Sequence, residues 1–326
     1  MMFSENEMLR MTKERNYKME KKAFFFIDDV IWVFRDLTRK RPPSLFDNPF
    51  LHVLKEAHDR YGLKVQLNVF YRTDYFYGSD EFTLADMTDA YKAEWEAATD
   101  WLKLGFHAKQ EFPDYPYINA DYHDVKQDFD AIQKEVYRFA GYKSFAYAVV
   151  THWLPMSKEG CQALKDSGIK IMSASYGEKA EYNGDRSILP YGHAFRLEQN
   201  RKPETGIFIR KTNDKAITAS LCGYNHVSEE KIRETDGMQK AVWDEETGMY
   251  FKKFCSGHVL NLIEKENTET EFLPYLDKEY FCYATHEQYF YVDYYAFQPD
   301  YAEKIMTAAE LVAKKGYTHF FVEEMV

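Results

Sequence analysis

Two adjacent carboxylates follow an apolar segment near the beginning of the chain. Residues 23–27 read Ala-Phe-Phe-Phe-Ile, and Asp28 and Asp29 come directly after them. Neighbouring side chains of an extended strand point to opposite sides, so such a strand would deliver the two carboxylates to opposite sides of the chain. One of them could then bind a metal ion while the other takes up a proton. The structural alternative is that a carboxylate here caps a following helix.

Histidines follow apolar segments elsewhere in the chain. His107 stands four residues before Glu111, and His152 and His286 each come at the end of a short apolar run. Imidazole nitrogens and carboxylate oxygens are ordinary ligands of divalent metals, and histidine also transfers protons near neutral pH. These residues are therefore candidates for a metal site with acid–base groups beside it. For His107 alone the alternative is a hydrogen-bonded structural role, and for Glu111 it is an exposed charge.

Alternating apolar and helical patterns predict the elements that would position these side chains. The polar cap Asn48, the early Pro49 and the terminal Gly62 mark one helix clearly. Further helices are expected at residues 87–102, 121–139, 158–167 and 299–315. Strands are expected at residues 23–29, 63–70, 104–107, 146–150, 169–173, 280–284 and 318–323. This alternation predicts a parallel sheet, either closed as a barrel or open and doubly wound.

We expect an α/β fold, specifically a parallel (β/α) barrel that is seven-stranded and distorted. Residues 22–175 and 279–326 would form the barrel, and the polar residues 1–21 are interpreted as a disordered leader. Residues 176–278 break the alternation and are interpreted as an inserted α+β lobe. In parallel α/β architectures active sites lie at the C-terminal ends of the strands. The aspartates and histidines named above could therefore share one pocket.

Charge and cysteine content disfavour several classes of function. The chain has 42 Lys and Arg against 53 Asp and Glu, a net charge of −11, which would repel nucleic acid. Its four cysteines are scattered singly, which argues against a disulfide framework or a thiolate zinc site. The apolar run at residues 23–27 is too short for a signal peptide or a membrane span. We expect a cytoplasmic protein that binds neither nucleic acid nor membrane, and the sequence leaves its oligomeric state open.

Aromatic side chains make up 17% of the sequence, and several stand close to the candidate site residues. Rings with a polar edge suit the apolar faces and hydroxyl edges of sugars. Trp153, Tyr289 and Tyr291 are therefore expected to bind a carbohydrate substrate. The alternative is that these rings pack around the rim of the core.

These residues resemble the polysaccharide deacetylases with NodB homology, a family of the glycoside hydrolase/deacetylase β/α-barrel superfamily. The family's first motif, an apolar strand running into Asp-Asp, is matched by residues 25–29, and its last motif, a strand ending in His, by residues 283–286. The resemblance covers residues 23–175 and 280–324. It implies a metal-dependent hydrolase that removes an N-acetyl or O-acetyl group from a carbohydrate. Asp28 would be the general base and His286 the general acid.

The resemblance also implies a divalent metal, most naturally zinc, bound by Asp29 and His107. The family's second motif is His followed four residues later by His, and this chain has Glu111 at the second position. The family's Arg-Pro-Pro-Tyr loop is replaced by residues 151–155, so the arginine that would orient the base is missing. His152 in that segment could fill the third ligand position. Val30 stands where a glycine normally follows the aspartate pair.

Two other classes of function stay open. A glycoside hydrolase of the same superfamily would need two carboxylates and no metal, and Asp28 with Glu287 or Glu323 would be the pair. A non-catalytic carbohydrate-binding protein could keep the fold and lose the ligands.

Overall fold

The computed structural model describes most of the chain in several stretches. These are residues 20–73, 81–111, 116–117, 120–153, 156–173, 179–182, 217–220, 240–245, 247–252 and 258–326. The expected leader lies outside them except for its last two residues. Within the expected insertion, residues 183–216 and 221–239 lie outside them as well.

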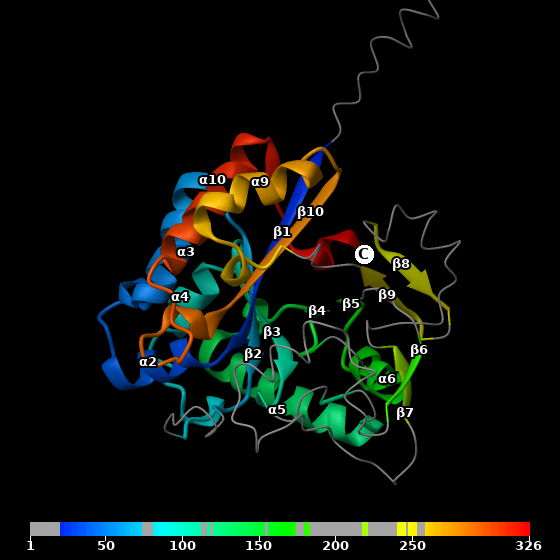
Figure 1. The fold of residues 1–326 in the computed structure, drawn as a ribbon. Helices are drawn as coiled ribbons and strands as arrows, with labels where there is room; N and C mark the ends of the chain where they lie inside the picture. The colour runs from blue at the N-terminus through cyan, green and yellow to red at the C-terminus, as the bar shows by residue number, and fades with distance from the viewer. Residues whose placement is uncertain are drawn as a thin grey trace, which may run out of the picture.

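A five-stranded parallel sheet carries the candidate site. Its strands are β1 (Lys21–Val30), β2 (Val65–Phe70), β3 (Leu102–Ala108), β10 (Tyr280–His286) and β11 (Tyr317–His319). The order is β10-β1-β2-β3, and β11 pairs with the beginning of β1. Figure 1 shows the long strands β1 and β10 side by side. Because all these pairs are parallel, the C-terminal ends of the strands meet at one edge.

A second sheet continues the arrangement beyond β3. Its strands are β4 (Ala148–Val149), β5 (Ile171–Ser173), β8 (Val242–Asp244) and β9 (Met249–Lys252), in the order β4-β5-β9-β8. Only the β8–β9 pair is antiparallel. One bridge between Leu104 and Phe145 joins β3 to the segment that enters β4. β6 (Lys179–Tyr182) and β7 (Ile217–Ser220) form a separate antiparallel pair.

The protein is thus a mixed α/β fold with parallel sheets, as the alternation predicts. The pairings of the described residues divide into separate sheets, so a closed seven-stranded barrel is not shown. The last strand also ends early, at His319, and a 3₁₀ turn, Val322–Met325, takes up the residues that were expected to complete it. None of the helices in the described stretches has the length and apolarity needed to cross a bilayer.

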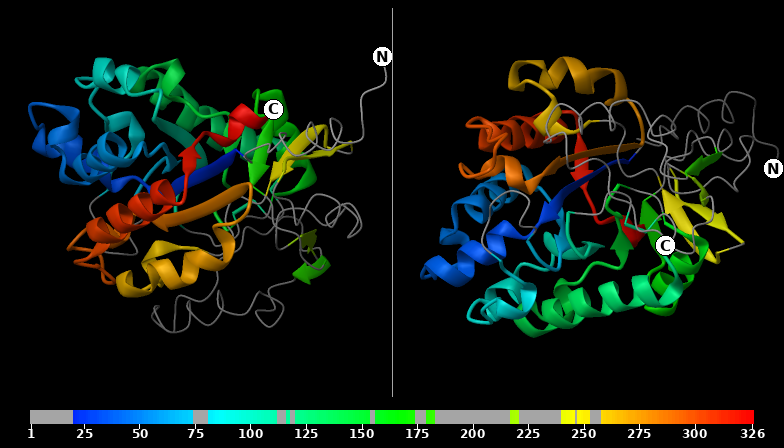
Figure 2. Two further views of the ribbon diagram at one scale, coloured as in Figure 1. Left: turned by 90° about the horizontal axis from the view of Figure 1, so that it is seen from above. Right: turned by 60° about the horizontal axis from the view of Figure 1, so that its bottom comes forward.

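Helices cover the sheets and connect the strands (Figure 2). They are α2 (Trp32–Lys40), α3 (Pro49–Tyr61), α4 (Lys92–Ala97), α5 (Tyr122–Ala140), α6 (Lys158–Asp166), α9 (Thr268–Phe272) and α10 (Tyr301–Lys314). α3 packs against α10, and α5 packs against α6. The boundaries of α3 are those predicted, because Asn48 caps its first amides and Gly62, at φ 67°, ends it. α4 is much shorter than expected, and α2 was not predicted.

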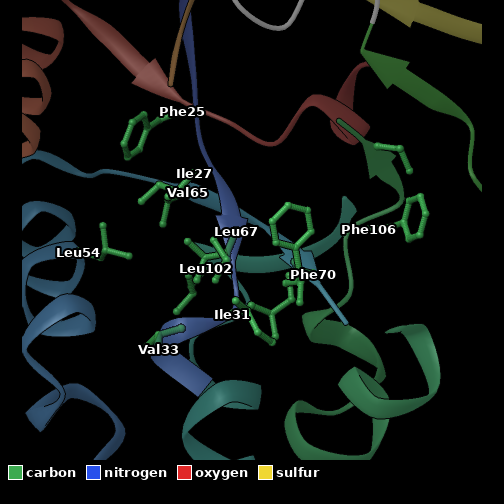
Figure 3. Close-up of a cluster of buried hydrophobic side chains, with 14 of the residues drawn as sticks. Phe25, Ile27, Ile31, Val33, Leu54, Val65, Leu67, Phe70, Leu102 and Phe106 are labelled. Carbon is green, nitrogen blue, oxygen red and sulfur yellow. The ribbon is translucent and has the colours of Figure 1, made fainter. Parts of the chain in front are cut away.

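The core has two parts, one on each face of β1. Phe25 and Ile27 pack with residues of β2 and β3 such as Leu67 and Leu102 (Figure 3). Phe24 and Phe26 face the other way, into a cluster with residues of β4, β5 and β10. Burial on both faces explains why β1 is apolar throughout rather than alternating.

Described parts of the expected insertion pack into this same core. Val242 and Met249 of the β8–β9 hairpin belong to the larger cluster, as do Leu260 and Phe272. β9 also extends the second sheet through its parallel pairing with β5. These segments therefore help to build the body that positions the site.

Candidate metal site

The end of β1 is irregular where the two aspartates stand. The pairing with β2 passes from Ile27 directly to Val30, so Asp28 and Asp29 form a bulge, and Asp29 has a φ of 61°. Bulges re-aim side chains and are common beside active sites. Both carboxylates consequently approach the same imidazole: Asp28 Oδ1 lies 3.8 Å from His107 Nδ1, and Asp29 Oδ1 lies 3.2 Å from His107 Nε2. The expectation that they point to opposite sides is wrong, because it assumed a regular strand.

His107 also lies at an irregular position. The pairing of β2 with β3 passes from Phe106 to Ala108, leaving His107 between them without a partner residue in the ladder. Its side chain is buried, and its Nδ1 is hydrogen-bonded to the backbone oxygen of Val150. Strands β1 and β3, which flank β2, therefore each break their regular pairing with it at a candidate ligand.

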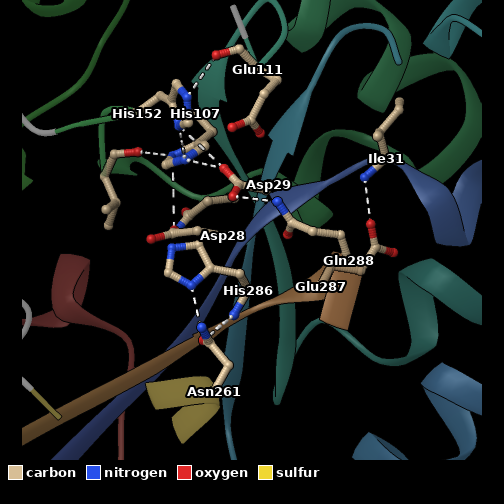
Figure 4. Close-up of polar contacts among 12 residues, drawn as sticks. Asp28, Asp29, Ile31, His107, Glu111, His152, Asn261, His286, Glu287 and Gln288 are labelled. Carbon is tan, nitrogen blue, oxygen red and sulfur yellow. Dashed lines mark hydrogen bonds and ion pairs between the residues drawn. The ribbon is translucent and has the colours of Figure 1, made fainter. Parts of the chain in front are cut away.

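His152 completes the cluster from the end of β4. Its backbone N–H donates to the backbone oxygen of His107 at 3.2 Å, and its ring Nε2 lies 3.0 Å from the backbone oxygen of Glu111. Its Nδ1 lies 3.2 Å from Asp29 Oδ1 and 3.2 Å from His107 Nε2. Figure 4 shows these three side chains converging.

The three atoms form a nearly equilateral triangle that fits a metal ion. Each pair among Asp29 Oδ1, His107 Nε2 and His152 Nδ1 is separated by 3.2 Å. Ligand atoms bound tetrahedrally at about 2.0–2.1 Å from zinc lie about 3.3 Å apart. The outer ring nitrogens, His107 Nδ1 and His152 Nε2, contact backbone oxygens and must therefore carry protons. In neutral rings the inner nitrogens, His107 Nε2 and His152 Nδ1, then present lone pairs. Three lone pairs directed at one point need a cation or a proton between them.

The charges in the cluster suit such a cation. Burial alone would raise the pKa of Asp29, but the imidazoles of His107 and His152 beside it hold that pKa well below its usual range. Burial lowers the pKa of His152. Burial also opposes the charged form of His107, yet the carboxylates of Asp28 and Asp29 outweigh it and raise that pKa. Asp29 thus carries a negative charge at neutral pH.

Asp28 and His286 lie beside this triangle. They are paired residues of β1 and β10, and burial raises the pKa of Asp28. Asn68 of β2 donates a hydrogen bond to Asp28 Oδ1 at 2.6 Å. The Nδ1 of His286 lies 3.0 Å from the side-chain oxygen of Asn261, which fixes a proton on that nitrogen. The structure therefore brings all five aspartates and histidines of the sequence analysis to one edge of the sheets.

Three amide side chains of the site were not anticipated. Asn68 and Asn261 hold Asp28 and His286, and Gln288 donates to Asp29 Oδ2 at 2.8 Å. Gln66 and Asn68 interrupt an apolar strand two residues apart, which places them on one face. That alternation is a signal that sequence reasoning could have used. For Asn261 and Gln288 the sequence carries no comparable signal.

Glu111 does not join the ligand triangle. Among the described residues, the group whose ligand atoms lie within 4.8 Å of one another consists of Asp29, His107 and His152. Glu111 contributes its backbone oxygen to His152, and it lines a small hollow beside Asp29 together with Arg72 and Gln288. The geometry thus favours His152 over Glu111 as the third ligand.

The three expected sugar-binding rings have different surroundings. Trp153 is half-buried, with its ring 6.0 Å from that of His152, and Tyr289 is half-buried 6.2 Å from His286. Tyr291 is 7% exposed and packs against Trp32, with its hydroxyl 3.4 Å from Glu287 Oε1. Tyr291 is therefore a core residue and offers no face to a sugar, which corrects the expectation for it.

The two carboxylates considered for a glycosidase pair are engaged elsewhere. Glu287 is fully buried and accepts hydrogen bonds from the backbone N–H groups of residues 31–33. Glu323 binds Lys103, near the beginning of β3, and the backbone N–H of Tyr147, just before β4. Both contacts lie at the opposite end of the strands from Asp28. Neither can face a substrate together with Asp28.

Comparisons with known proteins identify no family for this chain. Neither protein-family models nor curated proteins match its sequence. Among solved structures, it is similar to the 4-alpha-glucanotransferase from Thermococcus litoralis, with a TM-score of 0.47 and 11% identity. The match covers 94% of this chain, which spans 40% of the length of that enzyme. This similarity is too low for us to infer a shared family or activity.

Proposed function

We propose that the protein is a metal-dependent hydrolase that removes an acyl group from a carbohydrate. The observation that carries the proposal is the triangle of Asp29, His107 and His152, whose 3.2 Å edges fit a tetrahedral cation. The resemblance to NodB-homology deacetylases suggests the reaction.

Asp29, His107 and His152 would hold the ion, and a set of two imidazoles and one carboxylate is typical of catalytic zinc. When bound, zinc would polarise an acyl carbonyl and lower the pKa of a water molecule to about 7. The backbone oxygens of Val150 and Glu111 keep the two imidazoles oriented for this role.

Asp28 is suited to act as the general base. Burial raises its pKa, which strengthens it as a proton acceptor, and Asn68 fixes one of its oxygens. It would take a proton from water as the water oxygen bonds to the acyl carbon. Asn68 would thereby orient the base, the task of the arginine that this chain lacks.

His286 is suited to act as the general acid. Asn261 holds its Nδ1–H, so a His286 that carries a second proton on Nε2, as the imidazolium, would give that proton to the leaving nitrogen or oxygen as the bond to the acyl carbon breaks. The partly exposed rings of Trp153 and Tyr289 beside the two site histidines support a carbohydrate as the substrate.

We further propose that the two sheets belong to one distorted barrel around this chemistry. Phe24 of the first sheet and Ile171 of the second lie in the same buried cluster, together with Cys282. The bridge of Leu104 to Phe145 connects the sheets on one side. An experimental structure in which β4 and β5 pack away from β10 would contradict this arrangement.

Metal analysis combined with an acetate-release assay tests the function. Protein purified without chelator should contain about one equivalent of zinc or another divalent ion, and should release acetate from N-acetylated oligosaccharides until EDTA is added. Chelator-insensitive cleavage of glycosidic bonds would instead indicate a glycoside hydrolase. Sugar binding with neither metal nor turnover would indicate a carbohydrate-binding protein.

A further inference from the structure

The turn that carries Asp29 needs support from outside itself. Asp29 has a φ of 61°, in the left-handed region that residues other than glycine rarely adopt. The bulge lies at the end of β1, and α2 begins three residues after Asp29, at Trp32. The position of the Asp29 carboxylate therefore depends on contacts that hold this turn in place.

Glu287 holds the turn on its C-terminal side. Its carboxylate accepts hydrogen bonds from the backbone N–H groups of Ile31, Trp32 and Val33 at 2.7, 2.8 and 2.7 Å. Ile31 is the N-cap residue of α2 and makes no side-chain capping bond. Glu287 thus supplies, from the end of β10, the acceptors that the helix N-terminus needs.

Gln288 holds the Asp29 side chain itself. Its Nε2 donates to Asp29 Oδ2 at 2.8 Å, and the side chain is buried. This bond leaves Asp29 Oδ1 directed at the two imidazoles of the triangle. Figure 4 shows Gln288 beside the Asp29 carboxylate and Glu287 beside the backbone nitrogen of Ile31.

We propose that Glu287 and Gln288 are positioning residues of the metal site, an inference that rests on the proposed function. Neither belongs to the ligand triangle, so both act through Asp29. Because they fix the turn before an ion binds, they reduce the ordering that binding would otherwise require. They should therefore increase metal affinity beyond what the three ligands alone provide.

Zinc affinity of two variants and a matched control tests this inference. Glu287→Gln replaces one acceptor oxygen by an amide that repels the N–H groups, and Gln288→Met removes only the bond to Asp29. The control is Asn48→Ala, which removes another buried cap, bonded to the N–H groups of Phe50 and Leu51 at the start of α3. Competition with a chromophoric chelator should show zinc bound about 10- to 100-fold more weakly by the first two variants. The control should bind zinc like the wild type.

The outcomes separate this inference from the proposed function. Wild-type zinc affinity in both variants would overturn the inference and leave the function standing. A wild-type protein that binds no zinc would refute the function. In that case the inference is tested by the ¹⁵N NMR signals of the His107 and His152 rings in metal-free protein. Signals that shift in both variants but not in the control support positioning by Glu287 and Gln288, and unchanged signals refute it. Gln288→Met leaves the cap of α2 intact, so it decides the question if Glu287→Gln does not fold.

Discussion

At the scale of single residues, the site is defined by where its ring protons must be. Backbone oxygens bind the outer nitrogens of His107 and His152, so the inner nitrogens face Asp29 with lone pairs. The same residue types in other tautomers would form an ordinary hydrogen-bonded cluster. The hydrogen bonds of the outer ring nitrogens, rather than the ligand atoms alone, therefore distinguish a metal site from a buried polar cluster.

This distinction predicts an asymmetry between the two adjacent aspartates. Asp29→Ala or His107→Ala should abolish stoichiometric metal binding, because each removes one corner of the triangle. Asp28→Asn should keep the metal and reduce turnover by about 10²-fold or more, the usual contribution of a general base. Metal content and kcat of each purified variant measure this. Loss of metal in Asp28→Asn, with metal retained in Asp29→Ala, would reverse the proposed roles.

Asn68 should matter for turnover and not for metal binding. Its hydrogen bond to Asp28 is 2.6 Å long and buried, and Asn68→Leu removes it with little change in volume. A lost hydrogen bond to a charged group corresponds to about 1.5–3 kcal/mol, so kcat should fall roughly 10- to 100-fold. The assay is acetate release at saturating substrate, beside zinc analysis of the same sample. Unchanged kcat would show that Asp28 needs no orientation by Asn68.

At the scale of elements, the sequence predicted the strands but not their irregularities. The apolar segments before Asp28, His107 and His286 locate β1, β3 and β10, and parallel pairing brings their ends together. The bulge at Asp28–Asp29 could not be predicted, since no glycine or proline marks it, whereas Gly105 inside β3, two residues before His107, was a signal that went unused. The bulge at Asp28–Asp29 has long-range partners in Glu287 and Gln288, which stand more than 250 residues away in the chain.

Helix ends show the same contrast between local and long-range signals. α3 was predicted to the residue, because its cap, its proline and its glycine are all local. α2 was missed because its capping carboxylate, Glu287, comes from the 3₁₀ turn after β10, far away in the sequence. The ends of an element are thus readable from sequence only where its own flanking residues provide the caps.

The cap of α3 predicts a stability change that is independent of the site. Asn48 accepts hydrogen bonds from Phe50 and Leu51 at 3.0 and 3.2 Å and is buried. Asn48→Ala should therefore lower the free energy of unfolding by about 0.5–2 kcal/mol. Urea denaturation followed by circular dichroism measures this, and Asn48→Ser, which keeps an acceptor, should recover most of it. A full-sized loss in Asn48→Ser would show that packing, rather than capping, explains the effect.

At the scale of the whole molecule, the two ends of the strands serve different purposes. One edge gathers Asp29, His107 and His152. At the other end, Glu323 binds Lys103, and β11 pairs with the beginning of β1. The last described residues of the chain, including Phe320 and Val322, belong to the buried cluster shared by both sheets. The candidate site and the contacts of Glu323 thus lie at opposite ends of the strands.

His319 at this second end predicts how the whole protein responds to acid. It is buried on β11, lies 2.7 Å from the Tyr283 hydroxyl, and burial lowers its pKa to about 3. Between about pH 3 and its ordinary value of about 6.5, the unfolded chain binds a proton that the folded protein does not. This contribution therefore destabilises the fold as the pH falls, by about 2 kcal/mol between pH 7 and pH 5.

The variant His319→Gln separates this effect from all other titrations. Glutamine keeps a polar partner for Tyr283 but does not titrate, so every other group contributes equally to the two proteins. Free energies of unfolding from urea denaturation at pH 7 and pH 5 give the comparison. The wild type should lose about 2 kcal/mol more than the variant over this interval, whatever their difference at pH 7. Equal losses would mean that His319 binds its proton in the folded protein, and that this end of the molecule admits water.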